Sequence, residues 1–242
     1  MMDAKEKTQI AVTISSEFIN HVRQILWLCL DEAKTGKGVR LGINGYSFHA
    51  LPAYYSAVAA IEAFINESLL GQSARILTKD SPLWNLPADW LEKLDIGIKL
   101  VLVPQLLFGR TFKRNAQPYQ DMTLLIRIRN DLIHYKMSGR IPRYLSYLDD
   151  RGITLRSPRA KDSKVDYVWP HKLSCTEGVR WAHNTVCETV SSLVSFAADN
   201  ADWLMHTAPA FKPISEGDIT TWYLSQGIDP ASNNPPTPYE EA

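Results

Sequence analysis

Glu17 to Ala33 reads EFINHVRQILWLCLDEA, and its apolar residues recur at intervals of three and four positions. This spacing places them along one side of an α-helix, which turns about 100° per residue. Helical periodicity, or helix start and stop signals, also mark Pro52–Leu70, Trp90–Leu107, Pro118–Met137 and Ser174–Trp203. The sequence therefore predicts an all-α protein, a bundle of about five helices.

Two parts of the chain are predicted to depart from this bundle. Arg151–Leu155 and Val165–Trp169 favour extended structure, so a small β-hairpin is expected at about residues 150–170. After His206 the prolines become frequent and little can be buried, which predicts a loosely ordered tail at residues 207–242. We therefore expect one helical domain, residues 1–206, that contains the hairpin and precedes the tail.

Composition argues against several classes of protein. The chain has 242 residues, of which 45% are hydrophobic and 21% charged, as in ordinary globular proteins. No apolar run approaches the ~18 residues that cross a bilayer, and the first residues lack the apolar stretch of a secretory signal. Cys29, Cys175 and Cys187 form no C-x-x-C pair, so neither a disulfide framework nor a metal site is indicated. We expect a cytoplasmic protein with no membrane contact.

Positive charge is concentrated in the middle of the chain, although the formal net charge of the whole is zero. Residues 110–164 hold 13 Lys and Arg against 5 Asp and Glu, a net charge of +8. Arg110, Lys113 and Arg114 lie in a polar connection between predicted helices. They are the candidate contacts for a nucleic-acid backbone, since phosphate contacts dominate such binding. A basic surface that contacts only solvent would have the same composition.

One side of the predicted helix Pro118–Met137 is polar and titratable. Arg127, Asn130, Asp131 and His134 fall along it. An imidazole can transfer protons near neutral pH and a guanidinium can hold phosphate oxygens, so this combination suits phosphodiester chemistry without a metal. Asn130 lies one turn before His134, where it could orient the imidazole or contact a substrate.

Three other residues are predicted to support this side of the helix. Arg129 projects toward the apolar side and could turn inward to meet a buried acid, for which Glu62 is the candidate. Glu62 is expected to be a structural ion-pair partner, because a buried carboxylate needs compensation. Tyr135 could supply a hydroxyl from the rim. Without other information, an Arg and a His on one helix are most often surface or capping residues.

Arg129-Asn130, followed by three residues and His134, resembles the R-x(4 to 6)-H motif of HEPN (higher eukaryotes and prokaryotes nucleotide-binding) proteins. The resemblance extends to Ser56–Asn66, an apolar segment that contains one acid, to Val103–Leu107 and to Leu132–Tyr135. It implies an all-helical HEPN-like bundle. It also implies a homodimer whose two motif helices face each other around a shared, metal-independent ribonuclease cleft without a cofactor.

Two functions are compatible with this resemblance. In the first, His134 activates the ribose 2′-hydroxyl or protonates the leaving 5′-oxygen while Arg129 stabilises the phosphate, so the RNA products carry 2′,3′-cyclic phosphate ends. Such a ribonuclease could be a toxin with an antitoxin partner, an antiviral defence nuclease or a processing enzyme. In the second, the protein is an inactive module for dimerisation or for binding RNA or protein. Tyr135 directly follows His134, whereas some toxins place this tyrosine one residue later, so tyrosine modification is not expected.

Overall fold

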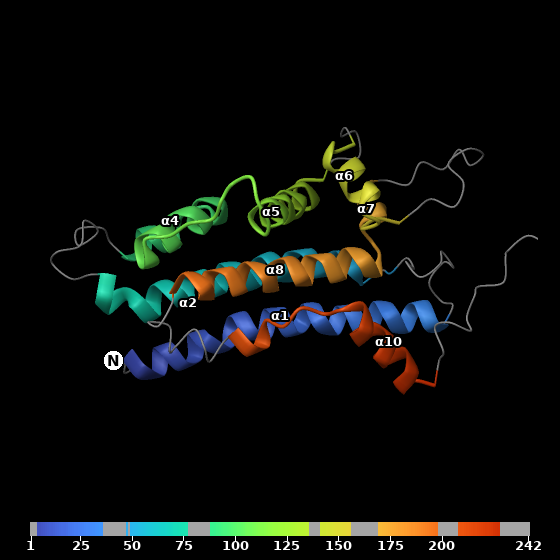
Figure 1. Ribbon diagram of the computed structural model, residues 1–242, viewed down its shortest axis with the longest axis horizontal. Helices are drawn as coiled ribbons and strands as arrows, with labels where there is room; N and C mark the ends of the chain where they lie inside the picture. The colour runs from blue at the N-terminus through green and yellow to red at the C-terminus, as the bar shows by residue number, and fades with distance from the viewer. Residues whose placement is uncertain are drawn as a thin grey trace, which may run out of the picture.

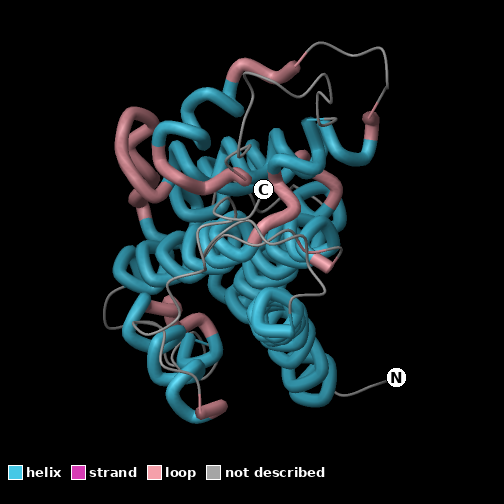
Figure 2. The backbone as a smooth tube through the Cα atoms, turned by 90° about the vertical axis from the view of Figure 1, so that its right-hand side faces the viewer, coloured by secondary structure: helices cyan, strands magenta, loops and turns pink. Residues whose placement is uncertain are grey.

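A computed structural model describes residues 4–35, 47, 49–76, 88–135, 141–155, 169–197 and 208–227. Figure 2 shows that this part of the backbone consists of helices and loops, without a β-strand. The elements are α1 (Ala4–Thr35), α2 (Ala50–Ile76), α3 (Ala88–Glu92), α4 (Ile96–Phe108), α5 (Tyr119–Ile133), α6 (Tyr144–Asp150), α7 (Trp169–Lys172), α8 (Thr176–Ala197), the 3-10 helix η2 (Ala208–Ala210) and α10 (Glu216–Ser225). The prediction of an all-α protein is confirmed for the described residues.

Helices α1, α2 and α8 run along the long axis of the molecule, and α4 and α5 pack on the side of α2 and α8 away from α1 (Figure 1). Helix α2 is therefore covered by several neighbours, which explains why its apolar residues are not confined to one stripe. Ala53, Ala57 and Ala60 of α2 are fully buried. Their small side chains let the neighbouring helices approach closely.

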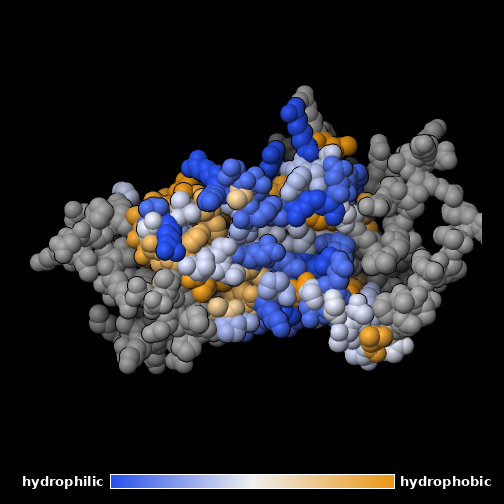
Figure 3. All heavy atoms as spheres, in the orientation of Figure 1, coloured by the Kyte–Doolittle hydropathy of each residue, from blue (hydrophilic) through white to orange (hydrophobic). Residues whose placement is uncertain are grey.

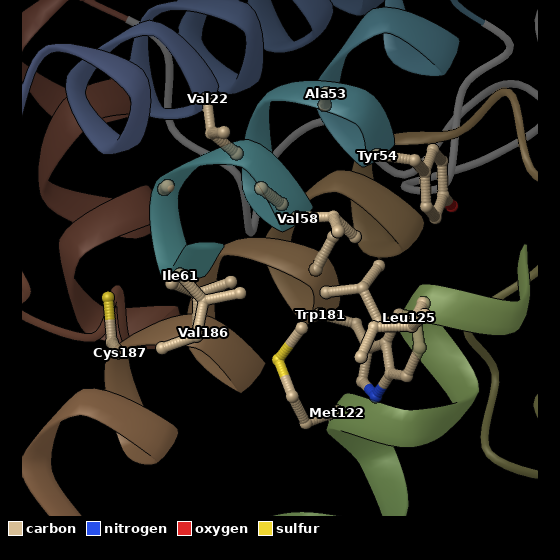
Figure 4. Close-up of a cluster of buried hydrophobic side chains, with 14 of the residues drawn as sticks. Val22, Ala53, Tyr54, Val58, Ile61, Met122, Leu125, Trp181, Val186 and Cys187 are labelled. Atoms are coloured by element: carbon tan, nitrogen blue, oxygen red, sulfur yellow. The ribbon is translucent and has the colours of Figure 1, made fainter. Parts of the chain in front are cut away.

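The core also fixes which side of α5 faces inward. In Figure 4, Val58 and Ile61 of α2 lie among Val186 of α8 and Met122 and Leu125 of α5. Each of these five side chains is at most 1% exposed. Because Met122 and Leu125 point into this cluster, the opposite side of α5 is left toward solvent.

The predicted β-hairpin is not confirmed. Residues 151–155 form a turn and irregular backbone after α6, and Trp169 begins α7 instead of ending a strand. The apolar residues that favoured a strand, Ile153 and Leu155, are buried in a loop instead. Their backbone N–H groups donate to the carbonyls of Leu148 and Lys172. Residues 156–168 lie outside the described part of the chain.

The predicted third helix is two helices. A break at residues 93–95 separates α3 from α4, where the Asp95 side chain caps α4 by accepting a hydrogen bond of 2.8 Å from the Gly97 N–H. Asp is among the residues preferred at this position because it satisfies an N–H that has no partner inside the helix. The new start moves Lys99 into the interior, where its side chain is 0% exposed.

The prediction of a loosely ordered tail is wrong for residues 208–227. Ser215 and Asp218 form a capping box at the start of α10, and this local signal outweighs the nearby prolines. Helix α10 then packs against α1, where the rings of Trp222 and Trp27 stack with centroids 5.8 Å apart. Residues 228–242 lie outside the described part of the chain.

Helix α8 holds the segment that leads into α10. The Asn184 amide donates to the Ile214 carbonyl at 2.9 Å and accepts from the Ile214 N–H at 2.8 Å. Phe211, which is 5% exposed, packs edge-on against Phe64 with ring centroids 5.4 Å apart. The C-terminal segment is therefore part of the packed structure.

Asn184→Ala should loosen this segment, because both backbone groups of the buried Ile214 lose their partner. We expect the free energy of unfolding to fall by about 1–3 kcal/mol and limited proteolysis within residues 208–227 to become faster. Asn184→Asp keeps the acceptor of the Ile214 N–H but loses the donor to its carbonyl, so its stability should lie between those of the parent and Asn184→Ala. A proteolysis pattern identical to that of the parent would show that the hydrophobic contacts alone hold the segment.

Candidate functional site

Helix α5 ends at Ile133, and His134 is its capping residue. The backbone N–H of His134 donates to the Asn130 carbonyl at 3.0 Å, but its φ of −99° and ψ of 24° leave the helical range. The prediction of a helix as far as Met137 is therefore too long, and residues 136–140 lie outside the described part. The imidazole of His134 is carried at the end of the helix and is exposed to solvent.

The polar side of α5 lies where the sequence predicts it. The side chain of Arg127 is 65% exposed and that of Asp131 40%, with 4.0 Å between Arg127 Nε and Asp131 Oδ2. Asn130 is half-buried. The Arg127 guanidinium also lies over the ring of Tyr144, 5.4 Å from its centroid. An exposed cation, a carboxylate and an amide thus accompany His134.

Arg129 does not meet Glu62. The Glu62 carboxylate pairs instead with Lys99, at 3.2 Å between Glu62 Oε1 and Lys99 Nζ. The same ammonium donates to Asn66 Oδ1 at 3.0 Å and to the Glu92 carbonyl at 2.6 Å. Arg129 is half-buried, and its Nε has no hydrogen-bond partner among the described residues. The sequence identified Glu62 as a structural partner but assigned it to the wrong cation.

Within one chain, Arg129 and His134 point in different directions. Five positions along an α-helix correspond to a rotation of about 140°, whereas seven positions return to nearly the same side. Arg127 therefore shares a side with His134, and Arg129 does not. A single copy of α5 does not bring both residues of the motif to one phosphate.

Tyr135 turns into the structure instead of standing at the rim. Its ring packs edge-on against Trp169 with centroids 5.8 Å apart, and Trp169 in turn packs against Tyr144 at 6.3 Å. The hydroxyls of Tyr135 and Tyr144 are buried without a hydrogen-bond partner among the described residues. Burial, together with the Asp131 carboxylate, raises the pKa of Tyr144. The Tyr144 phenol is therefore neutral at physiological pH.

The candidate RNA contacts lie at the other end of α5. Arg110, Lys113 and Arg114 are all exposed in the loop between α4 and α5. Phe112 anchors this loop, since it is 6% exposed and packs edge-on against Phe196 with centroids 5.1 Å apart. The 15 residues of α5 separate the loop from His134 by about 20 Å, at 1.5 Å per residue. The structure does not bring the basic loop and the motif together.

Sequence reasoning missed a buried polar network at the start of α5. The Asp121 carboxylate, which is 5% exposed, accepts hydrogen bonds of 2.7 and 2.9 Å from Arg151 and of 3.2 Å from Trp181 Nε1. Tyr147 Oη donates to it at 3.3 Å. These partners lie 26 to 60 positions from Asp121, so no local pattern announces them. The network ties α5 to α6 and α8.

Asp121 should make stability depend on pH. Burial raises the pKa of its carboxyl, but hydrogen bonds from Arg151 and Trp181 outweigh this effect and hold the pKa below its usual value. With a lowered folded-state pKa, the stabilisation is complete above the unfolded-state value of about 3.9 and is lost as the pH falls through the folded-state value.

We expect Asp121→Asn to lower the free energy of unfolding by about 1.5 kcal/mol at pH 7, and we expect the difference from the parent to shrink below pH ~4. Urea unfolding of both proteins across this range is the measurement. A difference that stays constant down to pH 3 would mean that the charge of Asp121 contributes nothing.

Among the described residues, no group of three His, Cys, Asp or Glu side chains gathers in a way that could hold a metal ion. None of the helices in the described ranges is both long enough and apolar enough to span a bilayer. Comparison of the chain with protein-family models, with curated proteins and with solved structures gave no match.

Proposed function

We propose that this protein is a HEPN-type endoribonuclease, which cleaves RNA without a metal at a cleft shared by two copies of the chain. The main support is that neither residue of the motif is used to hold the fold together. His134 is exposed at the end of α5, and Arg129 Nε has no hydrogen-bond partner among the described residues. A buried polar atom is normally paired, so the buried Nε without a partner is consistent with an arginine whose partner is a substrate phosphate.

The divergence of the two motif residues favours a composite site. Arg129 and His134 are separated by about 140° around α5, so one chain presents them to different neighbours. When two copies of α5 face each other around a two-fold axis, Arg129 of one copy can approach His134 of the other. We therefore assign the complete site to a homodimer.

The reaction follows from the chemistry of the two side chains. His134 accepts the proton of the ribose 2′-hydroxyl, and the 2′-oxygen then attacks the adjacent phosphorus. The bond from phosphorus to the 5′-oxygen breaks, and that oxygen takes up a proton as it leaves. Arg129 holds the non-bridging oxygens, where negative charge increases in the transition state. Asn130, one turn before His134, orients the imidazole or contacts the substrate.

An inactive dimerisation or binding module is the alternative. Its specific support is the exposure of two apolar side chains, Ile133 in the motif helix at 51% and Ile141 at 70%. A partner protein, such as an antitoxin or a defence-system component, would cover such side chains. In this case Asn130 and His134 would make hydrogen bonds at the contact and no RNA would be cut.

Mixed dimers test the composite site directly. We would purify Arg129→Ala and His134→Ala chains with different tags, alone and after co-expression, and incubate each with total RNA in the presence of a chelator. Each variant alone should be inactive. The mixed dimer retains one Arg129 facing one His134 across the two-fold axis, so it should recover part of the parent's cleavage.

If the mixed dimer is as inactive as the two single variants, both residues are needed in the same chain. This outcome would exclude the composite cleft. A parent protein that cuts no RNA and is a dimer by light scattering would favour the binding module. A parent that is strictly monomeric, with and without RNA, would contradict the composite cleft and leave the binding of a partner protein as the alternative.

A further inference from the structure

Helix α6 contacts α5 through side chains at two places. At the start of α5, Asp121 contacts Tyr147 and Arg151, which lie near the end of α6 and just after it. Further along α5, Arg127 contacts Tyr144, the first residue of α6. The two helices are neighbours in the upper layer of Figure 1. Side chains from both helices therefore line one surface that leads from the basic loop toward His134.

Two arginine–tyrosine stacks occupy this surface. Arg127 lies over the ring of Tyr144 at 5.4 Å, and Arg151 lies over the ring of Tyr147 at 5.1 Å. The two tyrosines are three positions apart in α6 and start from neighbouring points of the helix. The side chain of Arg127 is 65% exposed and that of Arg151 37%, and Tyr147 is 42% exposed. Tyr144 is only 7% exposed, so solvent meets the Arg127 guanidinium alone in the first stack and both Arg151 and Tyr147 in the second.

We propose that the two stacks bind successive bases of single-stranded RNA, in a track between the basic loop and His134. This inference rests on the proposed ribonuclease function and specifies its substrate class. Bases stack on aromatic rings and on guanidinium planes when they are not paired, whereas the base faces of an A-form duplex are inaccessible. A guanidinium on an aromatic ring is a stacking surface that a lysine does not provide.

The position of the stacks supports this assignment. Arg110, Lys113 and Arg114 precede α5 and are exposed to the phosphates of an approaching strand, while His134 follows α5. The stacks lie between these two ends, about 20 Å apart. In Figure 3, hydrophilic residues predominate over the middle of the upper layer, where α5 lies, although apolar residues are also exposed near α6.

The charges of the stacks predict how they contribute to binding. Asp131 lies 4.0 Å from Arg127, and Asp121 pairs with Arg151 at 2.7 Å. Because each arginine has a carboxylate beside it, the stacks attract phosphates weakly and contribute through short-range base contacts. The three cations of the loop have no such partner among the described residues. Removing a stack should therefore weaken binding without changing its salt dependence, whereas removing the loop cations should change both.

Binding is measured with the full His134→Ala chain, so that RNA stays intact. The probes are a single-stranded RNA that contains 2-aminopurine, whose fluorescence falls on stacking, and a duplex of the same length. Tyr147→Ala and Arg127→Lys should each weaken single-strand binding about tenfold with an unchanged salt slope. Replacing Arg110, Lys113 and Arg114 by Gln should reduce that slope by about 2. Arg143→Lys alters an exposed arginine outside the stacks, so it should bind like the parent.

Melting curves check that each variant is folded. If Tyr147→Ala is unstable, the single-strand affinity of Arg127→Lys tests the track. Single-strand affinities equal to the parent's for both variants, or equal binding of duplex and single strand, would overturn the track. Variants that weaken the dimer but leave RNA affinity unchanged would identify the stacks as a contact between copies. If the binding pattern holds but the parent cuts no RNA, the track stands and the ribonuclease proposal fails.

Discussion

His134→Ala should lower the rate of RNA cleavage by a factor of about 10²–10⁴, the contribution of a positioned general acid or base. Folding should be almost unaffected, because the side chain is exposed at the end of α5. Surface substitutions of this kind usually change the free energy of unfolding by less than about 0.5 kcal/mol. The measurement is the single-turnover rate on total RNA, read beside a urea unfolding curve.

His49→Ala is the matched control. The side chain of His49 is 54% exposed and pairs with Glu32 at 3.2 Å, just before the start of α2. Loss of a surface pair costs about 0–1 kcal/mol, so this variant should keep both its fold and its cleavage. Equal rates for His134→Ala and the parent would exclude His134 from the chemistry. Equal losses in both histidine variants would indicate general damage to the protein and not the loss of a catalytic group.

The helices of the bundle were predictable because their signal is local. The interval of apolar residues identifies α1, α2, α5 and α8 from the sequence, although α1 begins well before the expected Glu17. Two missed boundaries also had local signals. Asp95 precedes α4 and caps it, and Ser215 with Asp218 forms a capping box at the start of α10. Prolines near α10 and the continuous apolar pattern around Asp95 concealed these boundaries.

The partners of the charged residues were not predictable in the same way. The pattern of the sequence shows that Glu62 lies on a mostly buried helix and needs a cation, but it does not rank the available cations. Lys99 becomes the partner because the break before α4 sets which side of that helix faces α2. Asp121 and Arg151 are 30 positions apart and meet only because α6 folds back along α5. Such pairs depend on the packing of whole helices.

In the candidate site, too, local features were predictable from the sequence and long-range contacts were not. The sequence places Arg129, Asn130 and His134 on one element and predicts its polar side. It does not show that the helix ends before His134, nor that Tyr135 is held against Trp169. The rotation between Arg129 and His134 could be read from the spacing. The proposal that a second chain completes the site depends on Arg129 Nε having no hydrogen-bond partner among the described residues.

Glu62→Ala should destabilise the protein far more than Arg129→Ala. Lys99 is 0% exposed, and its ammonium has three acceptors, of which only Glu62 carries a negative charge. Removing that carboxylate leaves a buried cation with an amide and a carbonyl, so the free energy of unfolding should fall by about 3 kcal/mol. The Glu62 side chain is 38% exposed, which places the loss at the lower end of the range for buried pairs.

Arg129→Ala removes no ion pair of the described structure, so it should cost about 1 kcal/mol or less through lost packing while it abolishes cleavage. The double variant Lys99→Met, Glu62→Leu removes both charges and keeps apolar bulk, so it should recover most of the stability lost in Glu62→Ala. Urea unfolding of the parent and of the three variants measures all of these differences. A larger loss for Arg129→Ala than for Glu62→Ala would mean that Arg129 holds the fold together. The unpaired guanidinium assigned to the phosphate would then have a structural explanation instead.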